Sequence, residues 1–486
     1  MSAAALPMII QGGMGVAISD WRLAQTVARL GQLGVVSGTG IDTVLLRRLQ
    51  DGDPGGHMRR AIAHFPLPEV AEGALRRYFL PEGRKPGQLY KLLPLFRDGV
   101  SHAREQILML AAFVEVWLAK EGHAGMVGIN LLTKVQLPNL AMLYGAMLAN
   151  VDVVLMGAGI PRDIPAALDA MAEHRPAAIA FDVEGAGAGA AEQITFTPMD
   201  HWAGPPPALR RPMFFPIIAS NSLATMMARK AGGRVDGFVI EGPTAGGHNA
   251  PPRGEMQLNE RGEPVYGPRD EVDLAKIAQL GLPFWIAGGA GSPEGLRRAL
   301  DAGANGIQVG TLFAYCDESG LAEEYKGPVL HAAARGEVEV RTDPRASPTG
   351  YPFKVVSWAG YPAVDAKRAR ICDLGYLRTA FRDEDGKLAY RCASEPIDTY
   401  VAKGGAIEET EGRKCLCNAL MANVGLGQAR GDGAEPPLLT SGDDLLHIGT
   451  FLEGRARYGA ADVIDYLLAG ALAREGHASA AGELGL

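Results

Sequence analysis

A histidine that follows two glycines, in the stretch EGPTAGGHNAPPRG at residues 241–254, is the residue best placed in this sequence to do chemistry. The residues before it, 236–241, form an apolar run typical of a buried parallel strand, so His248 lies in the loop after a strand. Imidazole has an unperturbed pKa of about 6.5 and can give or take a proton at neutral pH. The pattern indicates an acid–base residue, or else a histidine that only closes a turn.

Glycine-rich segments follow several other predicted strands. They are Gln11-Gly12-Gly13-Met14-Gly15, Gly288-Gly289-Ala290-Gly291 and Gly310-Thr311. Glycine lets backbone amides come close to a phosphate, and helix N-termini favour anions. Ser292 and Pro293 predict a helix start directly after the second segment. The last two loops together indicate a phosphate site, although a single glycine pair is also common in ordinary turns.

The elements that must position these residues alternate between strands and helices. Eight β-rich runs lie at residues 8–11, 33–37, 127–131, 151–156, 215–220, 236–241, 284–287 and 306–309. Strands that alternate with helices pair in parallel, and eight such units predict an α/β fold, a closed (β/α)8 TIM barrel. Catalytic residues of this fold gather at the carboxyl ends of the strands. Ser19 is expected to cap the first helix.

Two regions of the chain are not part of the strand–helix repeat of the barrel. Nearly 90 residues separate the second and third strands, where a unit needs about 30. We assign residues 42–104 to an inserted helical cap that starts on the catalytic face and helps to shape the substrate cavity, and 104–120 to the barrel helix. The barrel then comprises 1–41 and 105–326, with an extra strand pair at 178–182 and 193–197 around a flexible GAGAGAA tip. Residues 327–486 form a C-terminal extension of uncertain fold, which also shapes the cavity and ends in an amphipathic helix around 461–473.

The composition restricts the class of protein. The chain has 486 residues, of which 47% are hydrophobic and 21% charged, as in a globular protein with a core. A net charge of -8 offers no basic footprint for nucleic acid. No apolar run reaches the roughly 18 residues of a membrane span, and the start lacks a secretory signal. We expect a soluble, cytoplasmic protein with a small-molecule substrate and no membrane partner. The composition does not decide whether the chain forms a homodimer.

Four segments together carry a resemblance to a known family: IIQGGMG, GINL, IEGPTAGGH and WIAGGAGSPEGLRRALDAGANGIQVGT. They resemble the nitronate monooxygenases, formerly called 2-nitropropane dioxygenases, and the related flavin-dependent enoyl-acyl carrier protein reductases. The resemblance covers roughly residues 6–41 and 125–325 and includes neither the insertion nor the C-terminal region. It implies a TIM barrel that holds FMN at the carboxyl face of its strands.

The resemblance also implies a role for each site residue. Gly12, Gly13 and Met14 would lie along the flavin ring, and Asn130 and Glu241 would contact the flavin. Gly288, Gly289, Gly310 and Thr311 would bind its phosphate. Gly246 and Gly247 would let the backbone pass close to the ring, so that His248 stands beside the reactive flavin edge as the catalytic acid or base.

Two reactions could use this histidine together with a bound flavin. In our first choice, an alkyl nitronate reduces the flavin and oxygen then reacts, while His248 orients the anion or deprotonates a neutral nitroalkane. In the second, NADH or NADPH reduces the flavin, and His248 protonates the α-carbon of an enoyl thioester. A third hypothesis is a flavin-binding assembly partner without catalysis, but a titratable histidine beside intact glycine loops argues against it.

Three further clusters have a functional and a plainer interpretation. Residues 42–104 hold eleven Lys or Arg against seven Asp or Glu. The doublets Arg47-Arg48, Arg59-Arg60, Arg76-Arg77 and Arg84-Lys85 either meet the phosphates of coenzyme A or an acidic carrier protein, or lie on solvated helix faces. His57 and His64 could share a helix face, without a third metal ligand. Cys372, Cys392, Cys415 and Cys417 either hold a metal or pack as small hydrophobes. Their spacing matches no standard ligand pattern, so we predict no metal site.

Overall fold

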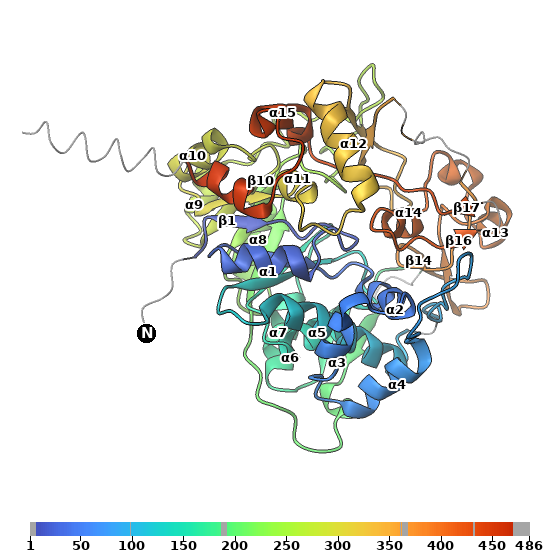
Figure 1. The fold of residues 1–486 in the computed structure, drawn as a ribbon. Helices are drawn as coiled ribbons and strands as arrows, with labels where there is room; N and C mark the ends of the chain where they lie inside the picture. The colour runs from blue at the N-terminus through green and yellow to red at the C-terminus, as the bar shows by residue number, and fades with distance from the viewer. Residues whose placement is uncertain are drawn as a thin grey trace, which may run out of the picture.

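A parallel sheet of eight strands forms the centre of the molecule. The structure is a computed structural model that describes residues 6–97, 99–185, 192–359, 361, 368–430 and 433–469. The strand order is β1 (Ile9–Gln11), β11 (Gly306–Val309), β10 (Phe284–Ala287), β9 (Phe238–Glu241), β8 (Met213–Ile218), β4 (Val153–Gly157), β3 (Val127–Leu132) and β2 (Gly34–Ser37). Backbone hydrogen bonds from Gln11 N to Leu33 O (3.0 Å) and from Leu33 N to Ile9 O (3.1 Å) join the two ends of this order. The sheet closes into the predicted (β/α)8 barrel (Figure 1).

Helices follow the strands around the barrel. They are α1 (Trp21–Arg29), α6 (Asn139–Leu148), α7 (Ile164–Ala172), α8 (Asn221–Lys230), α9 (Leu274–Ala278), α10 (Pro293–Asp301), α11 (Thr311–Ala314) and α12 (Glu323–Ala334). The predicted cap of α10 is confirmed, since Ser292 Oγ accepts from Gly295 N at 3.0 Å. The predicted cap of α1 is wrong, because Asp20 caps this helix. Ser19 bonds instead to the loop after β1, where its hydroxyl is needed.

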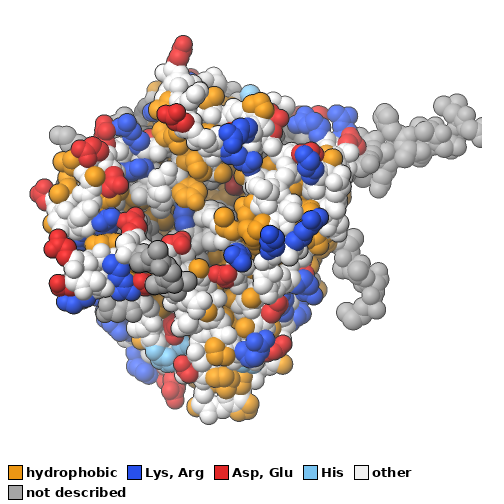
Figure 2. Space-filling model, turned by 180° about the vertical axis from the view of Figure 1, so that it is seen from behind, with side chains coloured by type: hydrophobic (Ala, Val, Ile, Leu, Met, Phe, Trp, Pro, Cys, Tyr) orange, Lys and Arg blue, Asp and Glu red, His pale blue; other side chains and the backbone are white. Residues whose placement is uncertain are grey.

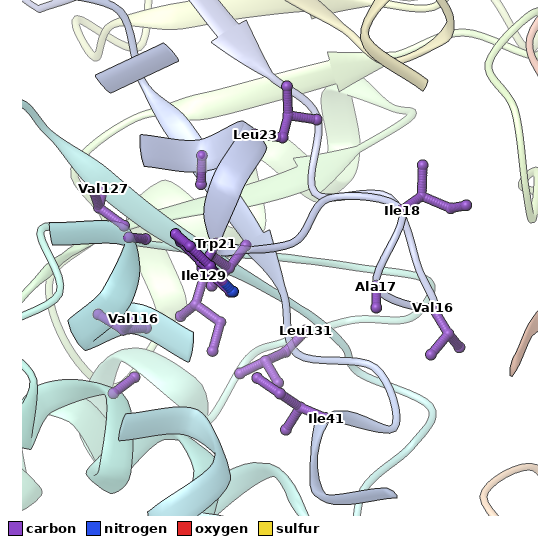
Figure 3. Packing of buried hydrophobic residues seen from close by; sticks show 14 of the residues in the cluster. Val16, Ala17, Ile18, Trp21, Leu23, Ile41, Val116, Val127, Ile129 and Leu131 are labelled. Atoms are coloured by element: carbon purple, nitrogen blue, oxygen red, sulfur yellow. The ribbon is translucent and has the colours of Figure 1, made fainter. Parts of the chain in front are cut away.

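The core has two parts, which the alternation of side chains along each strand separates. Val127, Ile129 and Leu131 of β3 belong to the cluster between the strands and the helices, together with Trp21 and Val116 (Figure 3). A second cluster fills the interior of the barrel and consists of Ile10, Leu33, Val35, Val153, Leu155, Phe215, Val239, Trp285 and Ala287. Each large side chain there contributes roughly 1.5–3 kcal/mol of burial free energy. The barrel is therefore a packed core, and a ligand must bind at one of its ends.

The segment between β2 and β3 is helical in part. It contains α2 (Ile41–Gln50), the 3-10 turn η1 (Pro54–Gly56), α3 (His57–Ile62) and α4 (Pro68–Tyr78), and it leads to α5 (His102–Lys120), the predicted barrel helix. The helices α2, α3 and α4 all pack against α5 (Figure 1). His57 and His64 do not meet, because the first ring lies against Trp21 and the second stacks on Trp117.

The basic doublets of this segment are largely engaged within the chain. Arg47 is buried, and Arg48 pairs with Asp20 and Glu115. The other ion pairs are Arg59 with Asp53, Arg60 with Glu121, Arg76 with Glu72 and Arg84 with Asp51. These carboxylates neutralise the charges that a phosphate group would have met.

Short hairpins and helices form the rest of the chain. β5 (Ala177–Ala180) and β7 (Gln193–Phe196) are the predicted extra pair, and most of the GAGAGAA tip lies outside the described residues. β12 (Glu339–Asp343) pairs with β13 (Phe353–Ser357), and β14 (Thr379–Arg382) pairs with β15 (Leu388–Arg391) and β6 (Val183–Glu184). The other elements are η2 (Pro198–His201), α13 (Ile397–Ala402), η3 (Ile407–Thr410), α14 (Leu416–Ala422), β16 (Ala429–Arg430), β17 (Gly433–Ala434), η4 (Asp443–His447) and α15 (Ile448–Leu452). Residues 460–469 are helical, and the remainder of the predicted last helix lies outside the described residues.

The surface has mixed charge. Figure 2 shows Lys and Arg side chains interspersed with Asp and Glu over one face of the molecule. Among the described helices, none combines the length and the apolar composition that crossing a bilayer requires.

Candidate functional site

One cavity of about 240 Å³ lies at the carboxyl ends of the barrel strands. All eleven residues predicted for the site line it: Gly12, Gly13, Met14, Asn130, Glu241, Gly247, His248, Gly288, Gly289, Gly310 and Thr311. They come from the ends of five strands, β1, β3, β9, β10 and β11. The closed barrel thus brings together residues that are up to 299 positions apart in the chain.

Three polar side chains reach the cavity from the interior face of the barrel. Val239 points into the barrel, so Glu241 two residues later does so as well. Ala287 is paired with both Glu241 and Gln308, which makes these two polar residues near neighbours. Among the described residues, Asn130 Oδ1 and Gln308 Oε1 are buried without a hydrogen-bond partner. Leaving a buried acceptor unpaired costs about 1–3 kcal/mol, so a ligand that donates to these two oxygens is favoured.

The loop after β1 is held rigidly against the cavity. Ser19 Oγ donates to Gly12 O (2.7 Å) and accepts from Met14 N (2.9 Å), and Asn130 Nδ2 donates to Gly13 O (3.0 Å). A β-carbon on Gly13 would lie 2.3 Å from the β-carbon of Asn130, so this position accepts only glycine. The loop therefore presents backbone rather than side chain to the cavity at Gly12 and Gly13.

The two loops predicted to bind phosphate lie on the same side of the cavity. Gly288 and Gly289 have φ angles of +85° and +65°, which favour glycine. Thr311 starts α11, and the amides of a first helical turn have no intrahelical acceptor. The C-terminal region also reaches these loops, since Gly442 N donates to Thr311 Oγ1 (3.1 Å) and Gly291 N donates to Asp444 Oδ2 (3.3 Å). Burial raises the pKa of Asp444 above its ordinary value.

His248 is fixed by the SPTGYPFKVV segment, residues 347–356. The His248 backbone bridges to Phe353 in antiparallel fashion, and Lys354 N donates to Gly247 O at 2.9 Å. His248 Nε2 lies 2.7 Å from Ser347 Oγ, and the imidazole meets the Phe353 ring edge-on at 4.8 Å. Burial, with a contribution from the charge of Lys134, holds the pKa of His248 well below its usual value. The imidazole is therefore neutral at neutral pH.

The two glycines before His248 serve different purposes. Gly247 has a φ of +78°, a conformation that favours glycine. A β-carbon on Gly246 would come within 2.8 Å of the Ser441 and Gly442 backbone. Gly246 thus makes room for the C-terminal region, a contact that the sequence did not predict.

Lys134 is a functional candidate that the sequence analysis missed. Within the described part of the chain, its Nζ is buried without a hydrogen-bond partner, and it stands 4.5 Å from the centre of the Tyr351 ring. Burial lowers the pKa of Lys134 to about 7 and raises the pKa of Glu241 to about 7. A charged residue just past the end of a barrel strand is a signal that could have identified Lys134, because it follows β3 by two residues.

The C-terminal region forms the roof of the cavity. The apolar lining residues there are Leu377, Leu416, Leu420, Met421 and Leu439. None of the described lining residues belongs to 42–104, so the expectation that the insertion shapes the cavity wall is not met. The insertion supports the roof instead, because the Asp42 carboxylate accepts from Tyr376 OH and pairs with Arg104 at 2.6 Å.

Comparisons with known proteins match part of this chain to nitronate monooxygenases. A family model described as nitronate monooxygenase matches residues 211–343, which contain seven of the eleven predicted site residues: Glu241, Gly247, His248, Gly288, Gly289, Gly310 and Thr311. Over this part of its length, the chain is similar to the nitronate monooxygenase family. A nitronate monooxygenase of Pseudomonas aeruginosa is 31% identical over 204 residues, which are 41% of this chain and 51% of that protein. A probable nitronate monooxygenase of Bacillus subtilis is 36% identical over 98 residues, or 20% of this chain and 26% of that protein.

The chain therefore aligns with about half of one nitronate monooxygenase and about a quarter of the other. Among solved structures, FabK from Thermotoga maritima aligns over 98% of this chain and 96% of its own, with 16% identity and a TM-score of 0.45. A nitroalkane oxidase from Streptomyces ansochromogenes aligns over 97% of both chains, with 14% identity and a TM-score of 0.44.

Proposed function

We propose that this protein is an FMN-dependent oxidoreductase that oxidises alkyl nitronates with molecular oxygen. The observation that carries the proposal is the convergence of all eleven predicted residues on one cavity, beside a neutral imidazole. The family match over residues 211–343 supports the same class of chemistry.

The residues that line the cavity fit FMN. Asn130 Oδ1 and Gln308 Oε1 are unpaired acceptors for flavin or ribityl donors. The loops at Gly288 and Thr311 offer backbone amides to the phosphate. When bound, FMN supplies the two-electron redox chemistry, and the chain's own groups bind the substrate and move its proton.

The groups around His248 suit an anionic substrate. A neutral imidazole can accept a proton from the α-carbon of a nitroalkane. When Ser347 Oγ accepts from Nε2, the lone pair of Nδ1 is free for that proton. A nitronate already carries the negative charge, so it needs only orientation, and the charged form of Lys134, which acts electrostatically on His248 without lining the cavity, would attract it.

The apolar roof favours a second candidate function, an NAD(P)H-dependent enoyl-thioester reductase. Leu377, Leu416 and Leu420 would contact an acyl chain as readily as the alkyl group of a nitronate. That reaction needs a proton donor, and a histidine whose pKa is well below its usual value holds little proton at neutral pH. Nitronate oxidation therefore remains the first choice.

Anaerobic mixing tests both candidates. The purified protein is mixed with propyl-nitronate, NADH or NADPH, and the flavin absorbance is followed. Bleaching by propyl-nitronate alone supports the proposal, and rapid bleaching by a nicotinamide favours the reductase. A flavin that none of the three reduces would favour the non-catalytic binding partner. A colourless protein that takes up no added FMN would overturn all three.

A further inference from the structure

Four cysteines from three separate segments meet in a small pocket of the C-terminal region. Cys372, Cys392, Cys415 and Cys417 all line it, and all are free thiols. Cys372 precedes β14, Cys392 directly follows β15, and the other two stand at the start of α14. The antiparallel pair β14 and β15 returns the chain beside its own beginning, since Thr379 is paired with Arg391. Secondary structure thus places these thiols together although up to 45 positions separate them.

Hydrophobic packing alone does not require four cysteines to meet at one place, because any small apolar side chain fills space as well. Here the four side chains line one pocket of about 10 Å³, with Pro348, Leu374 and Leu416 among its other lining residues. Cys392 is buried at 7% exposure, and the described thiols form no disulfide with one another. A ligand set for a soft metal is the arrangement that needs four thiols around one centre.

The separation of the sulfurs distinguishes between two kinds of metal centre. A single zinc ion binds thiolates at about 2.3 Å, which puts the sulfurs about 4 Å apart. Within the described residues, one group of three His, Cys, Asp or Glu side chains brings its ligand atoms within 4.8 Å of one another, and it is His102, Glu105 and His201. No three of the four sulfurs lie so close. In an iron–sulfur cluster at most two of the four thiolates share an iron, so no three sulfurs stand as close together as they do around one ion.

We propose that Cys372, Cys392, Cys415 and Cys417 bind an iron–sulfur cluster. Three arginines, Arg368, Arg370 and Arg378, lie close enough to interact electrostatically with these cysteines, and their charge offsets that of the thiolates and the cluster. Leu377, Leu416 and Cys417 line both this pocket and the barrel cavity, so the cluster site shares a wall with the candidate active site.

Elemental analysis of the whole protein tests the proposal. The full chain is produced and purified without oxygen, and iron, acid-labile sulfide, zinc and flavin are measured per chain. We expect iron and sulfide in equal amounts, with an electron paramagnetic resonance signal of a reduced cluster after dithionite treatment. Zinc without sulfide would overturn the cluster, and a chain without metal would overturn the site itself.

Cysteine variants show whether these side chains are the ligands. C392S and C417S are each expected to lose most of the iron and sulfide. The matched control is C316S, because Cys316 is a buried thiol in the barrel that donates to Phe313 O at 3.1 Å, and this variant should keep the iron of the wild type. Circular dichroism and flavin content are recorded for each variant. Iron that stays at the wild-type level in C392S and C417S contradicts the proposal, and the wild-type analysis decides the question if a variant does not fold. Since flavin is measured separately, failure of the cluster and failure of the flavin site are distinguishable.

Discussion

Replacing Lys134 by Met is expected to stabilise the protein and to impair its catalysis. The Lys134 ammonium group is buried, and within the described part of the chain it has no hydrogen-bond partner; its one recorded contact is the face of the Tyr351 ring. Methionine keeps most of the volume of this side chain without a charge to desolvate. The substitution thus removes a group whose position suits an anionic substrate better than it suits folding.

The size of the expected stabilisation follows from the difference in the pKa of Lys134 between the folded and the unfolded chain. Burial lowers the pKa of Lys134 from 10.5 to about 7. The unfolded chain therefore binds more protons than the folded chain between pH 7 and about 10.4, and stability rises with pH across this window. At neutral pH, the lower edge of this window, the desolvation cost is on the order of 4 kcal/mol. The lost contact with Tyr351 is worth about 0.5–2 kcal/mol, so K134M should gain roughly 2–4 kcal/mol at neutral pH.

Urea unfolding measured at neutral pH and at a pH of about 10 tests this reasoning, in parallel with turnover of propyl-nitronate. The wild type should become more stable relative to K134M as the pH rises, while K134M turns over more slowly. A matched control is K354M, because Lys354 is a buried lysine with partners, Thr342 Oγ1 at 3.0 Å and Asp443 at 2.7 Å, and its loss should destabilise. A K134M variant that is less stable than the wild type at neutral pH would refute the argument.

Three further variants test the site and its supports. H248A should keep bound FMN and lose turnover by roughly a hundred- to ten-thousandfold; an unchanged rate removes the acid–base role, and loss of flavin means that His248 mainly binds. D42N leaves the buried Arg104 without its ion-pair partner and should lower the free energy of unfolding by about 3–5 kcal/mol, whereas a loss below about 1 kcal/mol in urea would contradict a structural role. D444N removes a carboxylate beside the predicted phosphate loops and should raise the affinity for FMN about tenfold, or about 1.4 kcal/mol. A fluorescence titration of the flavin-free protein measures this affinity, and weaker binding would show that Asp444 supports the flavin.

The barrel and the eleven predicted residues that line the cavity were predictable, because the sequence patterns that indicate them are local. A strand shows its burial in a few residues, and Gly13, Gly247 and Gly288 are each required by backbone conformation or by a close neighbour. The fold then needs only the right count of strands to bring their carboxyl ends together. The eleven predicted residues meet in one cavity for that reason.

The roof and the surroundings of His248 were not predictable, because they depend on contacts between distant segments. Ser347 is 99 positions from His248, and no local pattern indicates that the two pair. Asp20 displaced Ser19 as the cap of α1 because the loop after β1 competes for the serine hydroxyl. The same holds for the four cysteines, whose spacing matches no ligand motif until two strands fold back on each other.

These long-range contacts influence the choice of substrate through the charges near the cavity. Burial gives both Glu241 and Lys134 a pKa of about 7, and it keeps His248 neutral. As the pH falls through this range, the lysine gains its charge and the carboxyl loses its own, so the surroundings of the cavity become more positive. An anion is therefore bound best on the acidic side of neutrality, where His248 still holds little proton. A nitronate satisfies both conditions, because it brings its own negative charge and needs no proton from the imidazole.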